Sequence, residues 1–188
     1  FNDISFEIPK NKHTIITGQN GTGKSTLLGL LSGIIYPNQG KVVTFSSDYG
    51  FIGATPMILN SSLRENLVYG NNEIIEDKKL LEMIHIFEVF NEDSKNILDL
   101  KISNKSLSTG QMQKISFIRA LLNKVDILLL DESLSNVDEK SKKKILEIIN
   151  KLEITIINIT HNLSDYENYD VHLEISIVNE DRLITKVT

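Results

Sequence analysis

Cysteine is absent from this chain of 188 residues. Disulfide bonds, zinc sites built on thiolates and cysteine nucleophiles are therefore excluded. Long hydrophobic runs are absent as well. The longest strongly apolar stretch, residues 27–36, contains glycine and serine and falls well short of the ~20 residues that a membrane-spanning helix needs. We therefore expect nothing in this segment to span a bilayer.

An excess of positive charge is also lacking. The sequence has 20 basic and 25 acidic residues, which gives a formal net charge of −5 and a pI of about 5.4. A protein that holds a polyanion through its overall field needs the opposite balance. The charge balance therefore argues against nucleic acid as a partner.

The composition is that of an ordinary globular protein, with 40% hydrophobic and 24% charged residues. A chain of this length can bury a core without disulfides, and its size favours one domain over residues 1–188. It begins at Phe1 rather than at methionine, and residues 1–8 alternate apolar and polar as a strand does. We expect a segment of a longer protein, with no signal-peptide architecture at its start.

Hydrophobic periodicity predicts alternating strands and helices. Apolar residues at helical spacing indicate a helix over residues 24–32. The densest apolar run, residues 125–130, is too short for a helix and suits a strand buried on both faces of a parallel sheet. We also predict strands at 4–8, 13–17, 41–45 and 154–160, a hairpin at 172–178 with 182–187, a lysine-rich helix near 140–149, and a mostly helical block at 61–123 that opens with a capping-box pattern at 62–65. This alternation implies an α/β sheet with residues 61–123 as a helical insertion.

A glycine-rich motif follows the strand predicted at residues 13–17. Residues 18–26 satisfy G-x-x-x-x-G-K-[ST] between a strand and a helix, the context that this phosphate-binding motif requires. Its glycines let backbone N–H groups turn toward an anion, and the helix N-terminus adds partial positive charge. Lys24 is suited to neutralise the outer phosphates, and Ser25 to hold Mg²⁺ through its hydroxyl. The candidate nucleotide contacts are Gly18, Asn20, Gly21, Thr22, Gly23, Lys24, Ser25 and Thr26.

Two carboxylates, Asp131 and Glu132, come directly after the strand predicted at 125–130. They would emerge at the carboxyl end of the sheet, where ligands of open α/β sheets bind. An acidic pair at a strand end is often only a solvated turn, but the phosphate motif reverses that preference. Asp131 is suited to a metal shell, and Glu132 to orienting and deprotonating an attacking water.

A second motif lies upstream of the acidic strand. Residues 107–122 begin Leu-Ser-Thr-Gly-Gln and end Arg-Ala-Leu-Leu. Together with the phosphate motif, this string resembles the signature motif and following helix of the ATP-binding cassette (ABC) family. Residues 135–138 resemble the D-loop of that family, and His161 resembles its switch histidine. Read alone, Ser108 and Gly110 would be helix-capping residues, and His161 a structural histidine at a strand end.

The resemblance implies an α/β fold of the P-loop NTPase (ABC ATPase) type, with a mostly parallel core sheet, a small antiparallel β subdomain and the helical insertion. It also implies two such domains, identical or different, that sandwich two ATP molecules head to tail and hydrolyse them with Mg²⁺. Each ATP then lies between the phosphate motif of one domain and the signature helix of the other. The resemblance adds His161 as a catalytic residue, and Ser108, Gly110, Gln111 and Asp138 as nucleotide contacts.

The chain also departs from the family pattern. Residues 51–67 resemble the loop that receives the membrane domain in exporters, but Ala54 stands where a glutamine usually reaches Mg²⁺ and the attacking water. Thr109 replaces the usual first glycine of the signature, and would be strained if that position needs a positive φ. The acidic X-loop sequence is missing at residues 102–106. We expect these three departures to weaken hydrolysis more than ATP binding. In relatives an aromatic residue from a loop just before the first strand stacks on adenine, and because this sequence starts inside that strand, it assigns no adenine contact.

The sequence favours the nucleotide-binding domain of an ABC exporter that carries an unknown cargo. We expect it at the cytoplasmic face of a membrane, with transmembrane domains in the same chain and no nucleic-acid partner. One alternative is a soluble ABC ATPase that acts on nucleic acid or ribosomes, against which the acidic balance argues. Another is an ATP-binding gate with slow turnover, which Ala54 favours and Glu132 and His161 oppose.

Overall fold

The computed structural model describes residues 1–90, 96–179 and 181–187. The chain forms two compact units. The first comprises residues 1–51, 125–132 and 153–188, and the second residues 52–124 and 133–152. Within the described ranges, no helix combines the length and the apolar character needed to cross a membrane.

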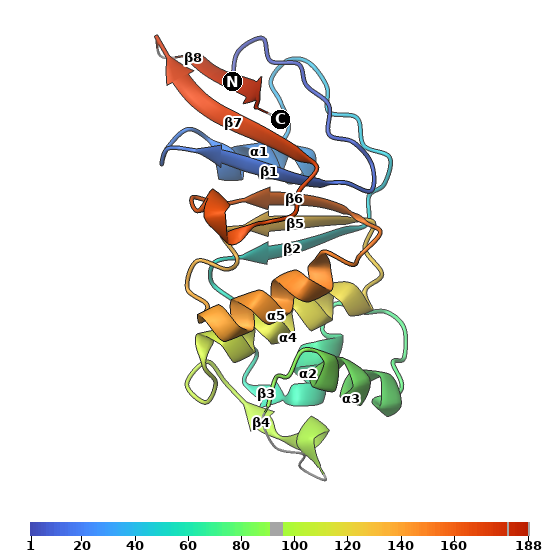
Figure 1. Cartoon of the computed structure of the whole chain (residues 1–188). Helices are drawn as coiled ribbons and strands as arrows, with labels where there is room; N and C mark the ends of the chain where they lie inside the picture. Colours follow the sequence, from blue (N-terminus) through green and yellow to red (C-terminus); the bar gives the residue numbers. More distant parts are fainter. Residues whose placement is uncertain (91–95, 180, 188) are drawn as a thin grey trace. The chain divides into compact units, whose positions relative to one another are not determined.

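A six-stranded sheet with the order β2-β5-β6-β1-β7-β8 runs through the first unit (Figure 1). Neighbouring strands pair in parallel from β5 through β6 and β1 to β7, and β7 and β8 form an antiparallel hairpin. The topology confirms the predicted mostly parallel sheet and the predicted closing hairpin. The strands are β1 (His13–Gly18), β2 (Tyr49–Gly53), β5 (Ile127–Asp131), β6 (Thr155–Ile159), β7 (Val171–Val178) and β8 (Asp181–Lys186).

Helix α1 (Lys24–Leu31) packs on one face of this sheet. Its Leu27 and Leu28 are buried among alternate residues of the central strands. Burying one such side chain contributes about 1.5–3 kcal/mol to folding, so this contact fixes the helix on the sheet. The buried cluster comprises Ile16, Leu27, Leu28, Ile127, Leu129, Ile157, Ile159, Val171, Leu173 and Ile175. A short 3₁₀ turn, η2 (Leu163–Asp165), follows β6.

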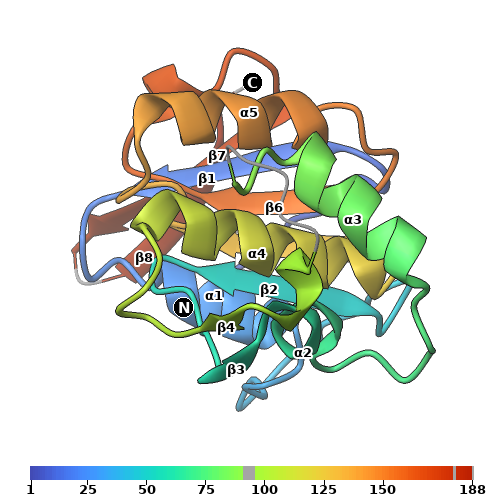
Figure 2. The ribbon, with the colours of Figure 1, turned by 90° about the horizontal axis from the view of Figure 1, so that it is seen from below.

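The second unit is mostly helical, as predicted for residues 61–123. Helices α4 and α5 lie side by side, with α3 beside α4 (Figure 2). The capping box predicted at residues 62–65 is confirmed, because Ser62 N–H donates to Glu65 Oε2 at 2.9 Å and Glu65 N–H donates to Ser62 Oγ at 3.2 Å. The elements are a small antiparallel pair, β3 (Ser61–Ser62) with β4 (Lys101–Ile102), the 3₁₀ turn η1 (Ile97–Asp99), and helices α2 (Leu63–Val68), α3 (Asp77–Ile86), α4 (Thr109–Leu122) and α5 (Glu139–Ile149).

The strand predictions at residues 4–8 and 41–45 are wrong, because neither segment pairs as a strand in a ladder. Alternation specifies a face for each segment, but a strand also needs a neighbour for its backbone groups. Phe6 and Ile8 pack against the buried cluster, whereas Val43 is 79% exposed. The sequence analysis missed β2, whose five residues include two glycines and therefore read as a loop.

A buried histidine begins the central strand β1. The ring of His13 packs edge-on against Tyr166, with ring centroids 6.0 Å apart. Burial lowers the pKa of His13 from 6.5 to about 4, although the backbone of Asn168 and the charge of Asp170 oppose that shift. The folded chain therefore keeps this ring neutral at a pH where the unfolded chain protonates it.

We expect the free energy of unfolding to fall as the pH drops from about 6.5 toward 4, because His13 takes up a proton first in the unfolded state. Between pH 7.5 and pH 5 the loss due to His13 should be about 2 kcal/mol. Urea unfolding of wild type and His13→Phe at both pH values measures it. The variant should lose that much less stability on acidification, and an exposed-site control, His85→Gln, should behave as wild type. Equal losses in wild type and His13→Phe would contradict this account.

Candidate functional site

The loop between β1 and α1 depends on a close backbone approach. Gly18 has a φ of 148°, and a Cβ at this position would lie 2.4 Å from the carbonyl oxygen of Ile175 in the neighbouring strand β7. Only glycine fits such a contact without moving the strand. Beyond it, the buried Thr22 hydroxyl donates to the carbonyl of Gln19 at 2.9 Å and holds the turn.

The N-terminus of α1 is left open to an anion. Its N-cap, Gly23, has a left-handed φ of 97° and supplies no side-chain cap. The first turn of α1 contains no acidic residue, and the same holds for α4, whereas α2, α3 and α5 each begin with one. Acidic side chains in a first turn offset the partial positive charge of a helix. The two helices that follow the predicted nucleotide motifs therefore keep that charge.

Lys24 turns its ammonium into the loop. Its Nζ donates to the carbonyls of Gly18 and Gln19 at 2.9 and 3.0 Å, and the residue is 6% exposed. Burial lowers the pKa of Lys24, while the negative charges of Glu132 and Asp131 act in the opposite direction. A buried cation beside open N–H groups gives the loop the electrostatics of a phosphate site.

The strand register places the acidic residues and the histidine predicted for the site at one edge of the sheet. Asp131, the last residue of β5, lies opposite Ile159, the last residue of β6, which in turn lies opposite Ile16 of β1. β5 and β6 therefore end in register, and β1 continues two residues further, to Gly18, so the loop that follows it lies at the same edge of the sheet. Glu132 and His161 follow β5 and β6 at this edge of the sheet.

Glu132 and His161 form a close polar pair. The Oε1 of Glu132 lies 2.6 Å from Nε2 of His161, and both side chains are about one-third exposed. Glu132 has a φ of 51°, a left-handed conformation that costs a non-glycine residue about 1–3 kcal/mol. Its backbone N–H donates to the carbonyl of Ile159 at 3.0 Å, which holds this turn against the end of β6. The strained turn fixes the direction of the carboxylate.

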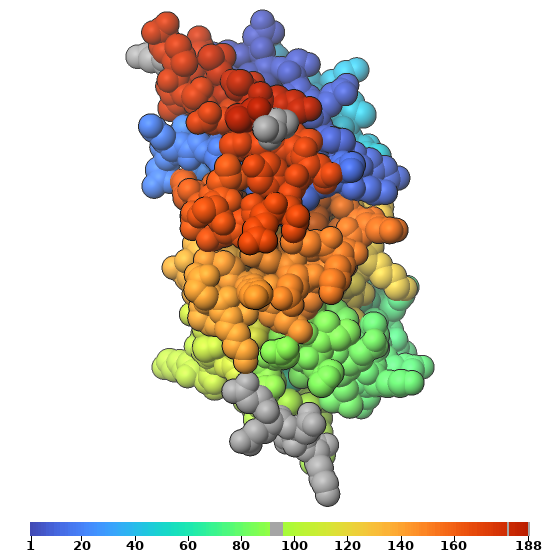
Figure 3. All heavy atoms as spheres, in the orientation of Figure 1, coloured from blue at the N-terminus to red at the C-terminus, as the bar shows by residue number. Residues whose placement is uncertain are grey.

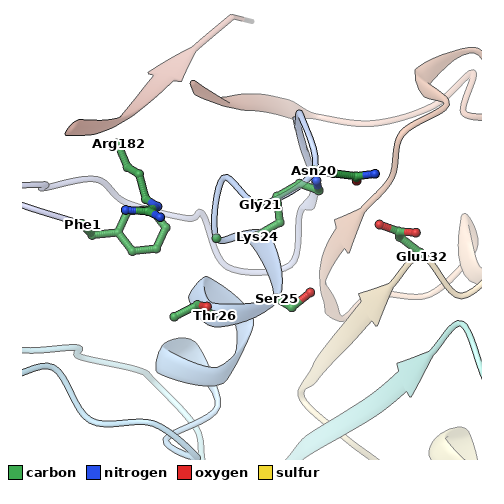
Figure 4. Close-up of a pocket in the computed structure, with 9 residues that line it drawn as sticks. Phe1, Asn20, Gly21, Lys24, Ser25, Thr26, Glu132 and Arg182 are labelled. Carbon is green, nitrogen blue, oxygen red and sulfur yellow. The ribbon is translucent and has the colours of Figure 1, made fainter. Parts of the chain in front are cut away.

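Glu132 and the residues of the loop after β1 line one pocket (Figure 4). Its volume is about 520 Å³, within the usual range for small-molecule sites. The lining residues are Phe1, Asn20, Gly21, Gly23, Lys24, Ser25, Thr26, Glu132 and Arg182. The pocket thus combines six of the predicted phosphate contacts with the predicted catalytic carboxylate, and it adds two side chains that the sequence analysis did not select.

The predicted signature residues form a second capping box in the other unit. Ser108 Oγ accepts from the N–H of Gln111 at 3.2 Å, and Gln111 Oε1 accepts from the N–H of Ser108 at 2.9 Å. Gln111 Nε2 also donates to the carbonyl of Val89 at 3.1 Å. Ser108 is therefore the N-cap of helix α4, which begins at Thr109. Thr109 is partly exposed and lies outside the set of residues with positive φ, so the condition under which it would be strained is not met.

Gly110 lies against the first turn of α5. A Cβ on Gly110 would lie 2.6 Å from Asp138 Oδ2 and 2.7 Å from Ser141 Oγ. Asp138 is the N-cap of α5, since its Oδ1 accepts from the N–H of Ser141 at 2.9 Å, and this bond lowers the pKa of Asp138. The signature and the D-loop residue are therefore packed together within the second unit.

Ala54, which stands where the family usually has a glutamine, is held in place by α4. The buried side chain of Gln113 donates from Nε2 to the carbonyl of Gly53 at 2.9 Å and to that of Ala54 at 3.4 Å. The backbone of Ala54 is thus tied to the signature helix. Its methyl side chain offers no oxygen or nitrogen for a phosphate, a metal or a water.

Comparison with known proteins identifies the family. The sequence model of the ABC transporter family matches residues 1–135. This chain belongs to the ABC transporter family. The match includes the phosphate motif, the signature motif and the acidic strand, which confirms the resemblance drawn from the sequence.

Individual relatives of this ABC domain are fused transport proteins. A Rickettsia prowazekii protein described as an export ATP-binding/permease protein is 34% identical over 192 residues, 93% of this chain and 33% of that protein. The lactococcin-A transport/processing ATP-binding protein of Lactococcus lactis is 32% identical over 198 residues, 97% of this chain and 27% of that protein. The chain thus spans a third or less of the length of these two relatives.

The fold of the ABC domain also matches a solved structure. A bacterial Atm1-family ABC exporter with ATP bound superposes with a TM-score of 0.79 at 24% identity. The match covers 91% of this chain and 33% of that chain. At this identity the likeness concerns the fold, and it confirms the predicted P-loop ABC architecture.

The structure brings some predicted residues of the ABC site together in the first unit, and the others belong to the second unit. Gly18 and Thr22 shape the loop rather than line the pocket. Asp131 precedes Glu132 at the end of β5 and His161 contacts Glu132, but neither lines the pocket. Sequence reasoning missed Phe1 and Arg182, because no local motif marks them. The remaining predicted contacts lie in the second unit and are Ser108, Gly110, Gln111 and Asp138.

Replacing Gly110 by alanine should destabilise the ABC domain by about 1–3 kcal/mol, because the new methyl group overpacks the contact with α5. Removing the opposing hydroxyl with Ser141→Ala should recover part of that loss. Urea unfolding of both single variants and the double variant measures the coupling, which should exceed about 0.5 kcal/mol. Thr109→Gly, one residue away and only partly buried, is the control and should bring no gain in stability. Strictly additive effects would show that α5 does not require this glycine.

Proposed function

We propose that this chain is the ATP-hydrolysing domain of an exporter-type ABC transporter. Family membership and the names of the relatives support ATP binding and transport. The observation that carries hydrolysis is the 2.6 Å contact between Glu132 and His161, with Glu132 lining the pocket that also contains Lys24. A phosphate site alone would suit a binding module, whereas a carboxylate held beside it by an imidazole supplies a general base.

In this proposal Lys24 and the N–H groups of α1 hold the β- and γ-phosphates. A water beside the γ-phosphate gives its proton to the carboxylate of Glu132 as its oxygen bonds to phosphorus. The bond from phosphorus to the bridging oxygen breaks, which leaves ADP and inorganic phosphate. His161 orients the carboxylate of Glu132 through its Nε2, and the left-handed backbone at Glu132 sets the direction in which that side chain leaves the turn.

The residues at this edge also fit Mg²⁺. Ser25 lines the pocket with its hydroxyl, and Asp131 ends β5 one residue before Glu132. The described residues contain no cluster of three or more acidic, histidine or cysteine side chains. Mg²⁺ in phosphoryl-transfer sites is commonly held by one or two protein oxygens plus substrate phosphates, so this sparse donor set suits it. We propose Ser25 and Asp131 as its protein ligands, and the bound ion would neutralise charge on the β- and γ-phosphates.

The second unit contains the residues that we propose contact the ATP held by a second domain. The first turn of α4 lacks acidic residues and is suited to an anion, so we assign Ser108, Gly110 and Gln111 to the γ-phosphate of ATP held by a second domain. Asp138, packed against Gly110, would lie at the same interface. Residues 61–123 then act as the helical subdomain of one ABC domain over residues 1–188. ATP joins two such domains, identical or different, and their closure drives transmembrane domains at the cytoplasmic face of a membrane.

Replacing Glu132 by glutamine should cut ATP turnover by about 10²–10⁴-fold, because the amide keeps the shape of the side chain but accepts no proton. ATP binding should persist, since Lys24 and the loop are unchanged. Steady-state phosphate release and equilibrium nucleotide binding separate the two effects. With ATP, the variant should elute from a size-exclusion column as a dimer.

The matched control for this experiment is Glu167→Gln, a change in an exposed carboxylate of the same unit that should leave turnover unchanged. If Glu132→Gln hydrolyses ATP like wild type, the catalytic assignment is wrong. If it stays monomeric at saturating ATP, the sandwich is wrong.

Replacing Ala54 by glutamine should raise ATP turnover by about tenfold, because one added hydrogen bond in the transition state is worth about 1.4 kcal/mol. Ala54→Met adds a side chain of similar length without the amide and serves as the control. Phosphate release at saturating ATP measures both variants. Turnover that stays at the wild-type level in both would favour the alternative of a slow, ATP-binding gate whose loop no longer serves hydrolysis.

A further inference from the structure

The two ends of the nucleotide pocket differ in chemistry (Figure 4). Glu132 lies at one end, and Phe1 and Arg182 lie at the other, with the loop residues Gly21 and Lys24 between them. In the proposed function the γ-phosphate sits beside Glu132, so the triphosphate runs along the loop toward Phe1 and Arg182. The sugar and the base must then extend toward that end.

Phe1 and Arg182 flank the same point on the loop. A Cβ on Gly23 would lie 3.1 Å from two ring carbons of Phe1 and 3.5 Å from Nε of Arg182. The left-handed N-cap of α1 is therefore where the aromatic ring and the guanidinium come closest to the phosphate loop. Gly23 leaves the space that both side chains and a ligand would share.

A second contact holds the two chain segments in register. Asn2 Nδ2 donates to Asp181 Oδ1 at 3.0 Å, so the residues next to Phe1 and Arg182 are hydrogen-bonded to each other. Figure 1 marks the N-terminus beside β8, and the space-filling view shows the C-terminal hairpin adjoining the first residues (Figure 3). Because Arg182 belongs to β8, paired along its length with β7, its backbone is fixed relative to the sheet.

The N–H donors of the Arg182 guanidinium make no hydrogen bond within the described residues, so they can bind another molecule. Across residues 1–90, 96–179 and 181–187, no hydrogen bond or ion pair engages this side chain, although the residue is only partly exposed. Lys24, by contrast, is already bonded to two loop carbonyls. A planar, permanently charged group stacks on flat π systems, which an ammonium does not.

We propose that Arg182 is a nucleotide-binding residue that holds the base of ATP, its guanidinium plane placed beside the ring of Phe1. This inference rests on the proposed function and deepens it, since it assigns the contact that discriminates a nucleoside triphosphate from a bare polyphosphate. Stacking of a side chain on a base corresponds to a preference of roughly 5- to 150-fold.

The test is equilibrium binding of two probes, ATP and inorganic tripolyphosphate, to the full-length protein. Arg182→Ala should raise the Kd for ATP about tenfold and leave the Kd for tripolyphosphate within about twofold. Arg182→Lys keeps the charge but loses the plane, so it should resemble Arg182→Ala. Lys186→Ala removes a cation from the same strand, at an exposed position, and should change neither Kd.

Two results would overturn the inference. If Arg182→Ala raises the Kd for ATP and for tripolyphosphate equally, the residue contacts phosphate rather than the base. If Arg182→Ala binds ATP as tightly as wild type, the residue is a surface charge with no part in binding. Because Arg182→Lys is a mild change on a surface hairpin, it tests the inference even if Arg182→Ala loses its fold. Failure of the proposed function looks different, since Lys24→Ala would then bind ATP as tightly as wild type.

Discussion

The register of the parallel strands is the constraint on which the site depends. Asp131, Ile159 and Ile16 lie opposite one another, so β5 and β6 end in register and β1 runs on only to Gly18 at the same edge of the sheet. A shift of one residue in any pair would turn the buried faces outward and would also displace the strand ends. The apolar residues that bury α1 on the sheet therefore also hold the phosphate loop, Glu132 and His161 at a common edge.

The close approach at Gly18 adds a second constraint to the same edge. Because the loop leaves β1 within van der Waals distance of β7, its path is determined by the neighbouring strand as well as by its own glycines. The hydrogen bonds of Lys24 to two loop carbonyls then hold the turn that ends at Gly23. The result is an open helix N-terminus beside a buried cation, with the carboxylate of Glu132 lining the same pocket.

Much of this site could be predicted from the sequence because its parts are encoded locally. The glycine pattern of residues 18–26 specifies its own backbone, and the buried run before Asp131 specifies a strand whose end places the acids. Other features depend on distant parts of the chain. Residues 4–8 and 41–45 have the alternation of strands but lack ladder partners, and β2 pairs despite its glycines because a neighbour accepts it. Arg182 lines the pocket because β8 folds back along β7, and no local sequence pattern indicates that position.

The two helix N-termini of the proposed mechanism are not equivalent, and the difference suggests an order of events. Helix α1 has no side-chain cap, so its free N–H groups gain most from an anion. Helix α4 has a capping box in which Ser108 and Gln111 already satisfy each other, so an anion there must replace bonds that exist. A nucleotide would therefore bind first at α1 of one domain. It would engage α4 of a second domain only once the phosphates are held in place, which makes closure depend on bound ATP. The packing of Gly110 on α5 keeps α4 ready for that step, because the helix start is fixed before any ligand arrives.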